Sequence, residues 1–295
     1  MARIYTNLEM IAQVSVEQTS YTKSFLGNYS DAFNALGRAS AGQSRNRLMS
    51  RDLSGCMADQ RIEHLAAFYE TLSRLEQRLG GRRTLLDEDD HRPWPVRGVY
   101  FFFEPGELRS ASGVGDRLVR VASRSTPPAA PMHRWGGHLS DRGGALGKGN
   151  HRSAIFRRLV GEALLRRSNR ALPSWGVGGS LREAAQRLPI DLASAATAEA
   201  DLEFEVSAYI RRMPFVWIEI PDAPSPDGRR DFFVRHAVAL LSNSPSRTDP
   251  PSPRWLGRSS SHNRVCTSGL WNNNHVQKAY DPRLLDAMGR VVESS

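Results

Sequence analysis

Two short apolar stretches near residue 100 have the pattern of strands buried in a sheet. The first, residues 100–103, reads Tyr-Phe-Phe-Phe and is bounded by Pro95 and Pro105. The second, residues 117–122, partly alternates arginine with leucine and valine. Short runs rich in aromatic and β-branched residues are typical of strands. Glycine, proline and serine between them supply turn residues, so we expect an antiparallel hairpin with a long loop.

Much of the remaining chain has the three-to-four-residue apolar spacing of amphipathic helices. The clearest stretch runs from Arg61 to Leu79 and ends before a Gly-Gly pair that suits a helix C-terminus. Ser180 and Glu183 have the spacing of a capping box. Residues 245–254 are rich in proline and predict a surface loop. Further helices are expected over residues 151–167, 181–188, 197–212, 229–242 and 282–292, with a third strand over residues 215–220. The order of elements predicts an α+β fold, with a small antiparallel sheet flanked by helices.

The first 58 residues differ in composition from the rest. They are rich in serine, asparagine, glycine and arginine, with no sustained apolar period. We expect residues 1–58 to be poorly ordered and residues 59–295 to form one domain with inserted helices and a C-terminal extension. No apolar run approaches the roughly 18 residues that span a bilayer, and no charged-then-apolar leader is visible. We therefore expect a cytoplasmic protein without a membrane partner.

The chain is basic, with a formal net charge of +9 and a pI of about 10.1. All but three of its 40 basic residues are arginines. A positive field of this kind attracts polyanions such as nucleic acid. The codon usage of a GC-rich genome produces the same arginine excess, so composition favours a nucleic-acid partner only weakly.

The two strands carry the triads Gly98-Val99-Tyr100 and Arg120-Val121-Ala122. This pair resembles the signature of the GIY-YIG nuclease superfamily, in which two triads lie on neighbouring antiparallel strands. The phrases that resemble a bacterial branch of this superfamily follow in order between about Trp94 and Leu285: WPVRGVYFFFEPGE, RLVRVAS, HLSDRGG, GNHRSAIFR, YIRRMPFVWIEI, VRHAVALLSN and SGLWNNNHV followed by YDP. The resemblance implies a metal-dependent endonuclease that acts on nucleic acid, with DNA as the expected partner and Mg²⁺ or Mn²⁺ as cofactor.

Phosphodiester hydrolysis needs an activated water, a cation that offsets charge on the phosphate oxygens, and a donor that orients the phosphate. By resemblance, Tyr100 stands at the tyrosine of the first triad and would act as general base or orient the water. The alternative is a strand tyrosine with a packing role. Arg120 replaces the tyrosine of the second triad, where its fork of N–H donors suits a phosphate.

Two other family positions carry different residues. His138 aligns with the leading arginine of the Arg-Leu-x-x-His-Arg-Gly pattern, and a neutral imidazole offers one N–H where a guanidinium offers five. Arg134 would share the helical face of His138 and could substitute for it, unless this stretch is a surface loop. Val234 aligns with the glutamate that holds the family's metal, and valine has no oxygen donor for Mg²⁺. Asp231, one helical turn earlier, is the nearby carboxylate that could replace it, so the site is either impaired or rebuilt.

Two further groups complete the predicted site. Asn243 matches the asparagine that closes the family's core. Asn150 is expected to cap the helix that follows it, with His151 and Arg152 in the first turn as phosphate contacts, although any capped helix has these features. Two hypotheses follow. The first is an endonuclease in which Tyr100, Arg120, His138 and Asn243 act in catalysis. The second is a catalytically inactive nucleic-acid-binding module that retains the fold.

Overall fold

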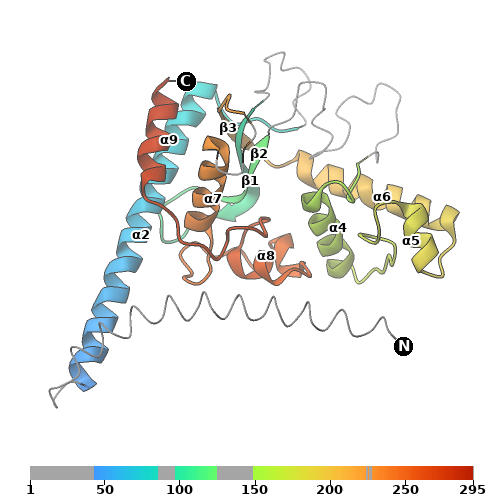
Figure 1. Cartoon of the computed structure of the whole chain (residues 1–295), viewed down its shortest axis with the longest axis horizontal. Coiled ribbons are helices and arrows are strands. Elements are labelled where there is room, and N and C mark those ends of the chain that lie inside the picture. The colour runs from blue at the N-terminus through green and yellow to red at the C-terminus, as the bar shows by residue number, and fades with distance from the viewer. Residues whose placement is uncertain (1–42, 86–96, 125–148, 224, 226–227, 295) are drawn as a thin grey trace, which may run out of the picture. The chain divides into compact units, whose positions relative to one another are not determined.

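The computed structural model describes residues 43–85, 97–124, 149–223, 225 and 228–294, of which 43–58 and 124 are described as backbone only. Residue contacts divide the chain into one unit over Met1–Met57 and a second over Ala58–Ser295. The second unit contains the whole described sheet (Figure 1). Within the described ranges no helix has the length and apolar character needed to cross a membrane.

The sheet has three antiparallel strands in the order β2-β1-β3. They are β1 (Gly98–Leu108), β2 (Asp116–Arg124) and β3 (Phe215–Glu219). The expected hairpin is β1 and β2, and the predicted third strand is present. Because β1 lies in the centre and both of its faces are covered, its sequence is a continuous apolar run rather than an alternating one.

The first residue of the first triad is glycine because β3 passes very close to it. A Cβ atom added at Gly98 would lie 2.4 Å from the carbonyl oxygen of Ile218. In the sheet, Gly98 pairs with Glu219 of β3 and with Arg124 of β2. A side chain at this position would therefore push the central strand away from its neighbour.

One face of the sheet is covered by α2 (Gln43–Leu79), α7 (Arg229–Leu241) and α9 (Arg283–Ser294). The β1 side chains on this face include Val99, Phe101 and Phe103, and all three are buried. They pack in one apolar cluster with residues of the three helices. We call this the α7 face of the sheet.

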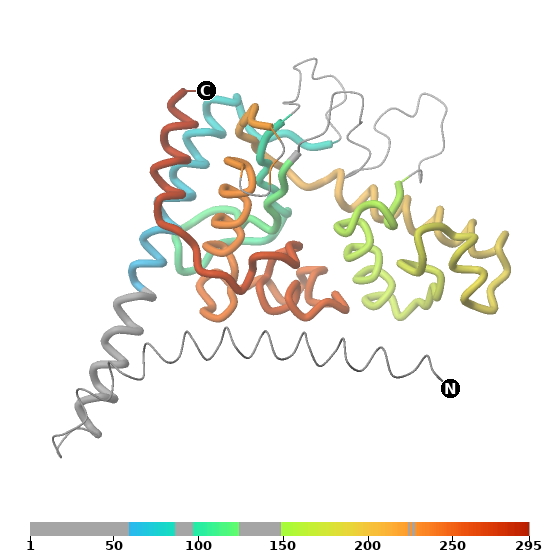
Figure 2. The backbone as a smooth tube through the Cα atoms, viewed as in Figure 1, coloured from blue at the N-terminus to red at the C-terminus, as the bar shows by residue number. Residues whose placement is uncertain are grey.

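The other face carries Tyr100 and Phe102 and is covered by α4 (Ile155–Arg167), α6 (Leu192–Arg211) and the 3₁₀ helix Leu256–Ser259. Trp271 and α8 (Asn263–Ser268) complete this second cluster, and α5 (Leu181–Arg187) packs beside α6. We call this the Tyr100 face. Figure 2 shows the chain running from α7 through α8 to α9 in orange to red. Helices on both faces of a small antiparallel sheet confirm the predicted α+β fold.

Several helix boundaries differ from the sequence expectation. Helix α2 begins at Gln43 rather than Arg61, but it ends before the Gly-Gly pair as predicted. Helix α6 begins at Leu192 rather than residue 197 because Asp191 caps it, accepting from the Ser194 N–H at 2.7 Å. The predicted cap of α5 is confirmed, because the Ser180 side chain accepts from the Glu183 N–H.

Candidate functional site

Tyr100 lies in the middle of the central strand with its side chain fully buried. It pairs with Ala122 on β2 and with Trp217 on β3, so the two triads are direct neighbours in the sheet. Its ring contacts the rings of Phe215 and Trp217, with centroids 6.0 and 6.5 Å apart. The predicted adjacency of the triads is therefore present, and the tyrosine is held rigidly among aromatic side chains.

Arg120 reaches the same face from β2. Its guanidinium lies over the Phe156 ring of α4, 4.1 Å from the centroid, and donates to the Trp271 carbonyl oxygen at 3.2 Å. Its Nε is buried without a hydrogen-bond partner, and no carboxylate pairs with it in the described part of the chain. Burial lowers the pKa of Arg120 to about 10, because a charged guanidinium is poorly solvated there. Tyr100 and Arg120 thus share one face, where an anion would meet an uncompensated cation.

Glu104 is a polar residue of this face that the sequence reasoning missed. It follows Tyr100 and Phe102 on the same side of β1, and its carboxylate accepts hydrogen bonds from the Tyr209 hydroxyl and from the indole N–H groups of Trp255 (3.0 Å) and Trp271 (3.3 Å). Burial raises the pKa of Glu104, and these three hydrogen bonds partly oppose the rise. Glu104 therefore organises the aromatic cluster of the Tyr100 face.

Asp231, the predicted replacement metal ligand, lies in the first turn of α7, which packs on the α7 face. Its carboxylate pairs with Arg235 at 2.6 Å. Val234, which the resemblance places at the family's metal-ligand position, is partly buried and packs against the apolar cluster of α2, α7 and α9. The structure thus places Tyr100 and Arg120 together and Asp231 on a helix of the opposite face. Among the described residues, no group of three His, Cys, Asp or Glu side chains could hold a metal ion.

The edge of β2 connects the two faces. The Trp271 N–H donates to the Val119 carbonyl oxygen at 2.7 Å, and the Asn272 side chain bonds both the N–H and the carbonyl of Val121 (3.0 and 2.8 Å). The segment after α8 therefore follows the strand edge, with Trp271 in the cluster of the Tyr100 face. Burial lowers the pKa of His275, and the charge of Asp231 opposes this shift.

Asn243, predicted as catalytic, is buried at the end of α7. Its amide nitrogen donates to the carbonyl oxygens of Asp249 (2.8 Å) and Ser268 (3.1 Å), and its oxygen accepts from the Thr248 N–H at 3.1 Å. Both ends of the amide are thus used to fix the loop after α7 against α8. Thr248 and Asp249 are buried, so the expectation of a simple surface loop over residues 245–254 is wrong for its centre.

The predicted cap at Asn150 is wrong. Helix α4 begins at Ile155, and its N-cap is Ala154, which makes no side-chain capping bond. Asn150 instead accepts from the Arg152 N–H at 3.0 Å and closes a separate turn, because a short asparagine side chain competes with helix formation. The Arg152 guanidinium forms a bidentate pair with Glu199 of α6 at 2.6 and 2.7 Å. Its charge is therefore already balanced.

His151 is buried beside this pair. Its ring stacks on Trp175 with centroids 3.7 Å apart, and its Nδ1 lies 2.9 Å from the Glu203 carboxylate. Its Nε2 is buried without a hydrogen-bond partner. Burial alone would raise the pKa of Glu203, but hydrogen bonds from His151 and the charge of Arg157 hold it below its ordinary value. Asn150, His151 and Arg152 share a cavity of about 410 Å³ with Glu199 and Glu203.

Arg134 and His138, the predicted helix contacts to phosphate, lie outside the described residues. The expectation of poor order over residues 1–58 falls largely outside them as well.

Comparison with known families identifies the class of protein. The family model of the GIY-YIG domain matches residues 59–295, so the chain belongs to the GIY-YIG family. No curated protein and no solved structure matches the chain. Membership supports a nuclease-like function with nucleic acid as the substrate class, and nucleases of this family generally depend on a divalent metal. At the position that the resemblance assigns to the metal ligand, the described residues do not fit such an ion, since Val234 has no oxygen donor and Asp231 is paired with Arg235.

Proposed function

We propose that this GIY-YIG domain binds nucleic acid through the half-buried Arg120, on the β2 side of the Tyr100 face, without the metal-dependent hydrolysis typical of the family. The observation that carries the proposal is Val234. Its side chain packs against the apolar cluster of α2, α7 and α9 at the position where the family has its metal-binding glutamate. A hard cation such as Mg²⁺ needs oxygen ligands, and a packed valine offers none. The proposed partner is DNA.

The environment of Arg120 supports binding. A half-buried guanidinium whose Nε is buried without a hydrogen-bond partner, and which has no carboxylate partner among the described residues, destabilises a fold, and an apolar side chain of similar size would be more favourable there. A bound phosphate would supply the missing negative charge, because arginine matches phosphate oxygens with two parallel N–H donors. The net charge of +9 would attract the polymer over a longer range.

Hydrolysis is the second candidate, and the adjacency of Tyr100 to the second triad favours it. In this case Tyr100 would orient the water, Arg120 would contact the phosphate, and Asp231 would replace the missing ligand. His138 or Arg134 would supply the helix contact, and Asn243 would hold the core together.

An experiment that measures both DNA retention and plasmid cleavage distinguishes the two candidate functions. Labelled duplex DNA is passed over immobilised full chain at increasing salt, and supercoiled plasmid is incubated with the protein and Mg²⁺ or Mn²⁺. We expect retention that falls as salt rises, and no nicked product at any metal concentration. Arg120→Met should weaken retention, while Arg254→Met, which removes an exposed arginine elsewhere, serves as the matched control.

Nicking that disappears in Tyr100→Phe would establish the second candidate instead. A chain that retains neither DNA nor RNA at low salt would overturn the proposal altogether. The double variant Val234→Glu with His138→Arg restores both family side chains. Metal-dependent cleavage by this variant would show that the site lost its ligands and kept its geometry, whereas an inactive variant would indicate deeper change.

A further inference from the structure

A second concave site lies between α7 and α9, on the sheet face opposite Tyr100. It has a volume of about 420 Å³, within the range of roughly 300–1,000 Å³ typical of small-ligand sites. The described residues that line it are Gly228, Arg229, Phe232, Phe233, Arg283, Ala287 and Arg290. We call it the α7–α9 pocket. None of its residues belongs to the site predicted from the sequence.

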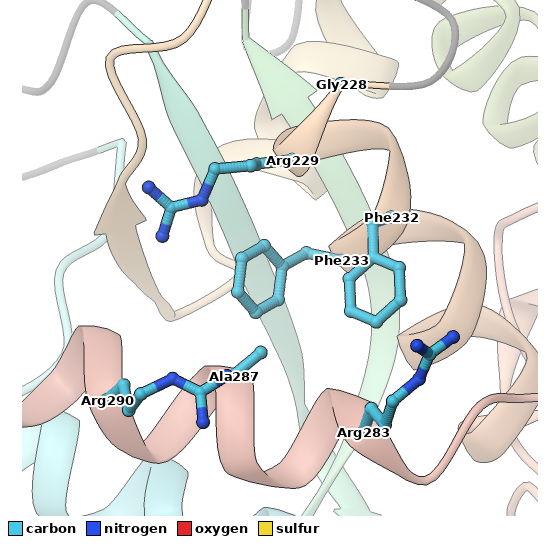
Figure 3. Close-up of a pocket in the computed structure, with 7 residues that line it drawn as sticks. All are labelled: Gly228, Arg229, Phe232, Phe233, Arg283, Ala287 and Arg290. Atoms are coloured by element: carbon cyan, nitrogen blue, oxygen red, sulfur yellow. The ribbon is translucent and has the colours of Figure 1, made fainter.

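The floor of the pocket is aromatic. Phe233 is 2% exposed, while Phe232 is half-buried beside it, and both line the pocket. Figure 3 shows both rings directed into the space between the two helices. Phe232 also contacts His236, with ring centroids 4.6 Å apart, which holds the ring in place. Such a surface suits a flat, weakly polar ring.

Three arginines stand around this floor. In Figure 3 Arg229 extends from the start of α7, and Arg283 and Arg290 extend from α9. All three are exposed. Arg283 pairs with Asp281 at 2.5 Å, but its side chain stays 81% exposed. Arg229 and Arg290 have no carboxylate partner in the described part of the chain, and none of the described lining residues is acidic.

The ligand must therefore combine two chemistries. Guanidinium groups bind anions with several oxygens, phosphate above all, and α7 presents its N-terminal end to the same space. Phosphate alone would leave the aromatic floor open to water, and an apolar molecule would leave the arginines without an anion. A planar base that carries a phosphate satisfies both.

We propose that the α7–α9 pocket binds a nucleotide, with the base against Phe232 and Phe233 and the phosphate between Arg229 and Arg290. A free nucleotide and the unpaired end of a nucleic-acid strand with a 5′-phosphate share this chemistry. The pocket lies across the sheet from Arg120, so nucleotide binding here is independent of nucleic-acid binding at the Tyr100 face.

The test measures binding of five probes to the full chain by calorimetry: adenosine monophosphate, adenosine, inorganic phosphate, and a single-stranded oligonucleotide in two forms, with and without a 5′-phosphate. We expect adenosine monophosphate to bind at least about tenfold more tightly than adenosine or inorganic phosphate. A preference of the oligonucleotide for its 5′-phosphate form would identify the strand end as the source. Equal affinity for both forms, with tight mononucleotide binding, would identify the free nucleotide.

The variant Arg229→Gln with Arg290→Gln removes two exposed charges and should weaken nucleotide binding at least about tenfold. The variant Arg247→Gln with Arg254→Gln makes the same charge change at exposed residues outside the pocket and should leave it unchanged. Phe232→Leu should bring the affinity for adenosine monophosphate close to that for inorganic phosphate.

Equal binding of all probes, or equal losses in the two double variants, would overturn the inference and indicate non-specific attraction to a basic surface. Arg120→Met separates this inference from the proposed function. It should reduce DNA retention while adenosine monophosphate still binds, and a parallel loss of both would show that the two sites are not independent.

Discussion

At the scale of single residues, the half-buried Arg120 and the buried Asp249 differ in how far their charges are compensated. Asp249 accepts from the N–H groups of Ser110, Ala111 and Ser112 (2.9, 2.9 and 3.2 Å) and from the Ser112 hydroxyl. Every oxygen of this carboxylate is thus compensated. By contrast, the Arg120 guanidinium donates to the carbonyl oxygen of Trp271 and lies over the ring of Phe156. A charged side chain without an opposite charge beside it is typical of a ligand-binding site.

We predict that Arg120→Met raises the free energy of unfolding by about 1 kcal/mol while it weakens DNA retention. Burial lowers the pKa of this base, so the folded state holds its proton less tightly than the unfolded chain does. The charged Arg120 side chain therefore lowers the free energy of unfolding at every pH below about 10. Urea unfolding at neutral pH measures the change, and a less stable variant would show that Arg120 has a structural role.

Asp249 predicts an acid-dependent loss of stability. Burial alone would raise its pKa, but the hydrogen bonds from Ser112, Ser110 and Ala111 hold it below the ordinary value. A carboxyl group with a lowered folded pKa contributes stability that is complete above the unfolded pKa and lost as the pH falls through the folded one. Asp249→Asn should thus cost about 1–3 kcal/mol at neutral pH and little in strong acid. Urea unfolding of both proteins between neutral pH and strong acid tests this, and a constant difference would contradict it.

At the scale of elements, the central strand β1 explains most of the fold. It contributes Tyr100 and Phe102 to one apolar cluster and Val99, Phe101 and Phe103 to the other. This dual burial is why the hairpin was predictable from a short apolar run. The β2 edge was not predictable, because Asn272 imitates a neighbouring strand through side-chain bonds to Val121. No local pattern marks an asparagine for that task.

We predict that Gly98→Ala destabilises the domain by about 1–3 kcal/mol, since the added methyl would clash with the β3 backbone. Gly289→Ala is the matched control. Gly289 lies in α9 with nothing within 4 Å of an added Cβ, so the same change should be neutral or slightly stabilising. Thermal unfolding of both variants compares them directly. Equal effects would show that the close approach at Gly98 does not constrain the sheet.

At the scale of the whole molecule, the family match and the contact-defined unit begin within a residue of each other, at 59 and 58. Arg61 then connects the start of this unit to α7, because its guanidinium donates to the carbonyl oxygens of Ala239 (3.1 Å), Leu240 (2.7 Å) and Ser242 (2.5 Å). These are carbonyls at the helix end that lack helical partners.

We predict that residues 58–295 unfold cooperatively with the same midpoint as the full chain. Within this fragment, Arg61→Ala should lower the free energy of unfolding by about 1.5–3 kcal/mol, because charged donors to the end of α7 are lost. Arg254→Ala, at an exposed arginine, should have no effect. A fragment that fails to fold would show that residues 1–57 are part of the domain.

By itself the sequence determined the strands, most of the helices and the family, because each depends on apolar period, turn residues or ordered phrases that local chemistry imposes. It also indicated Val234 as a departure from the metal site. The tertiary structure alone decided which side chains meet. Tyr100 and Arg120 share a face because Arg120 pairs with Phe102, which lies on the same side of β1 as Tyr100, whereas Asp231 lies on a helix of the opposite face. Arg152 pairs with Glu199, and arginines of α7 and α9 line one pocket, although in both cases the residues are far apart in the chain. No local sequence pattern determines such contacts.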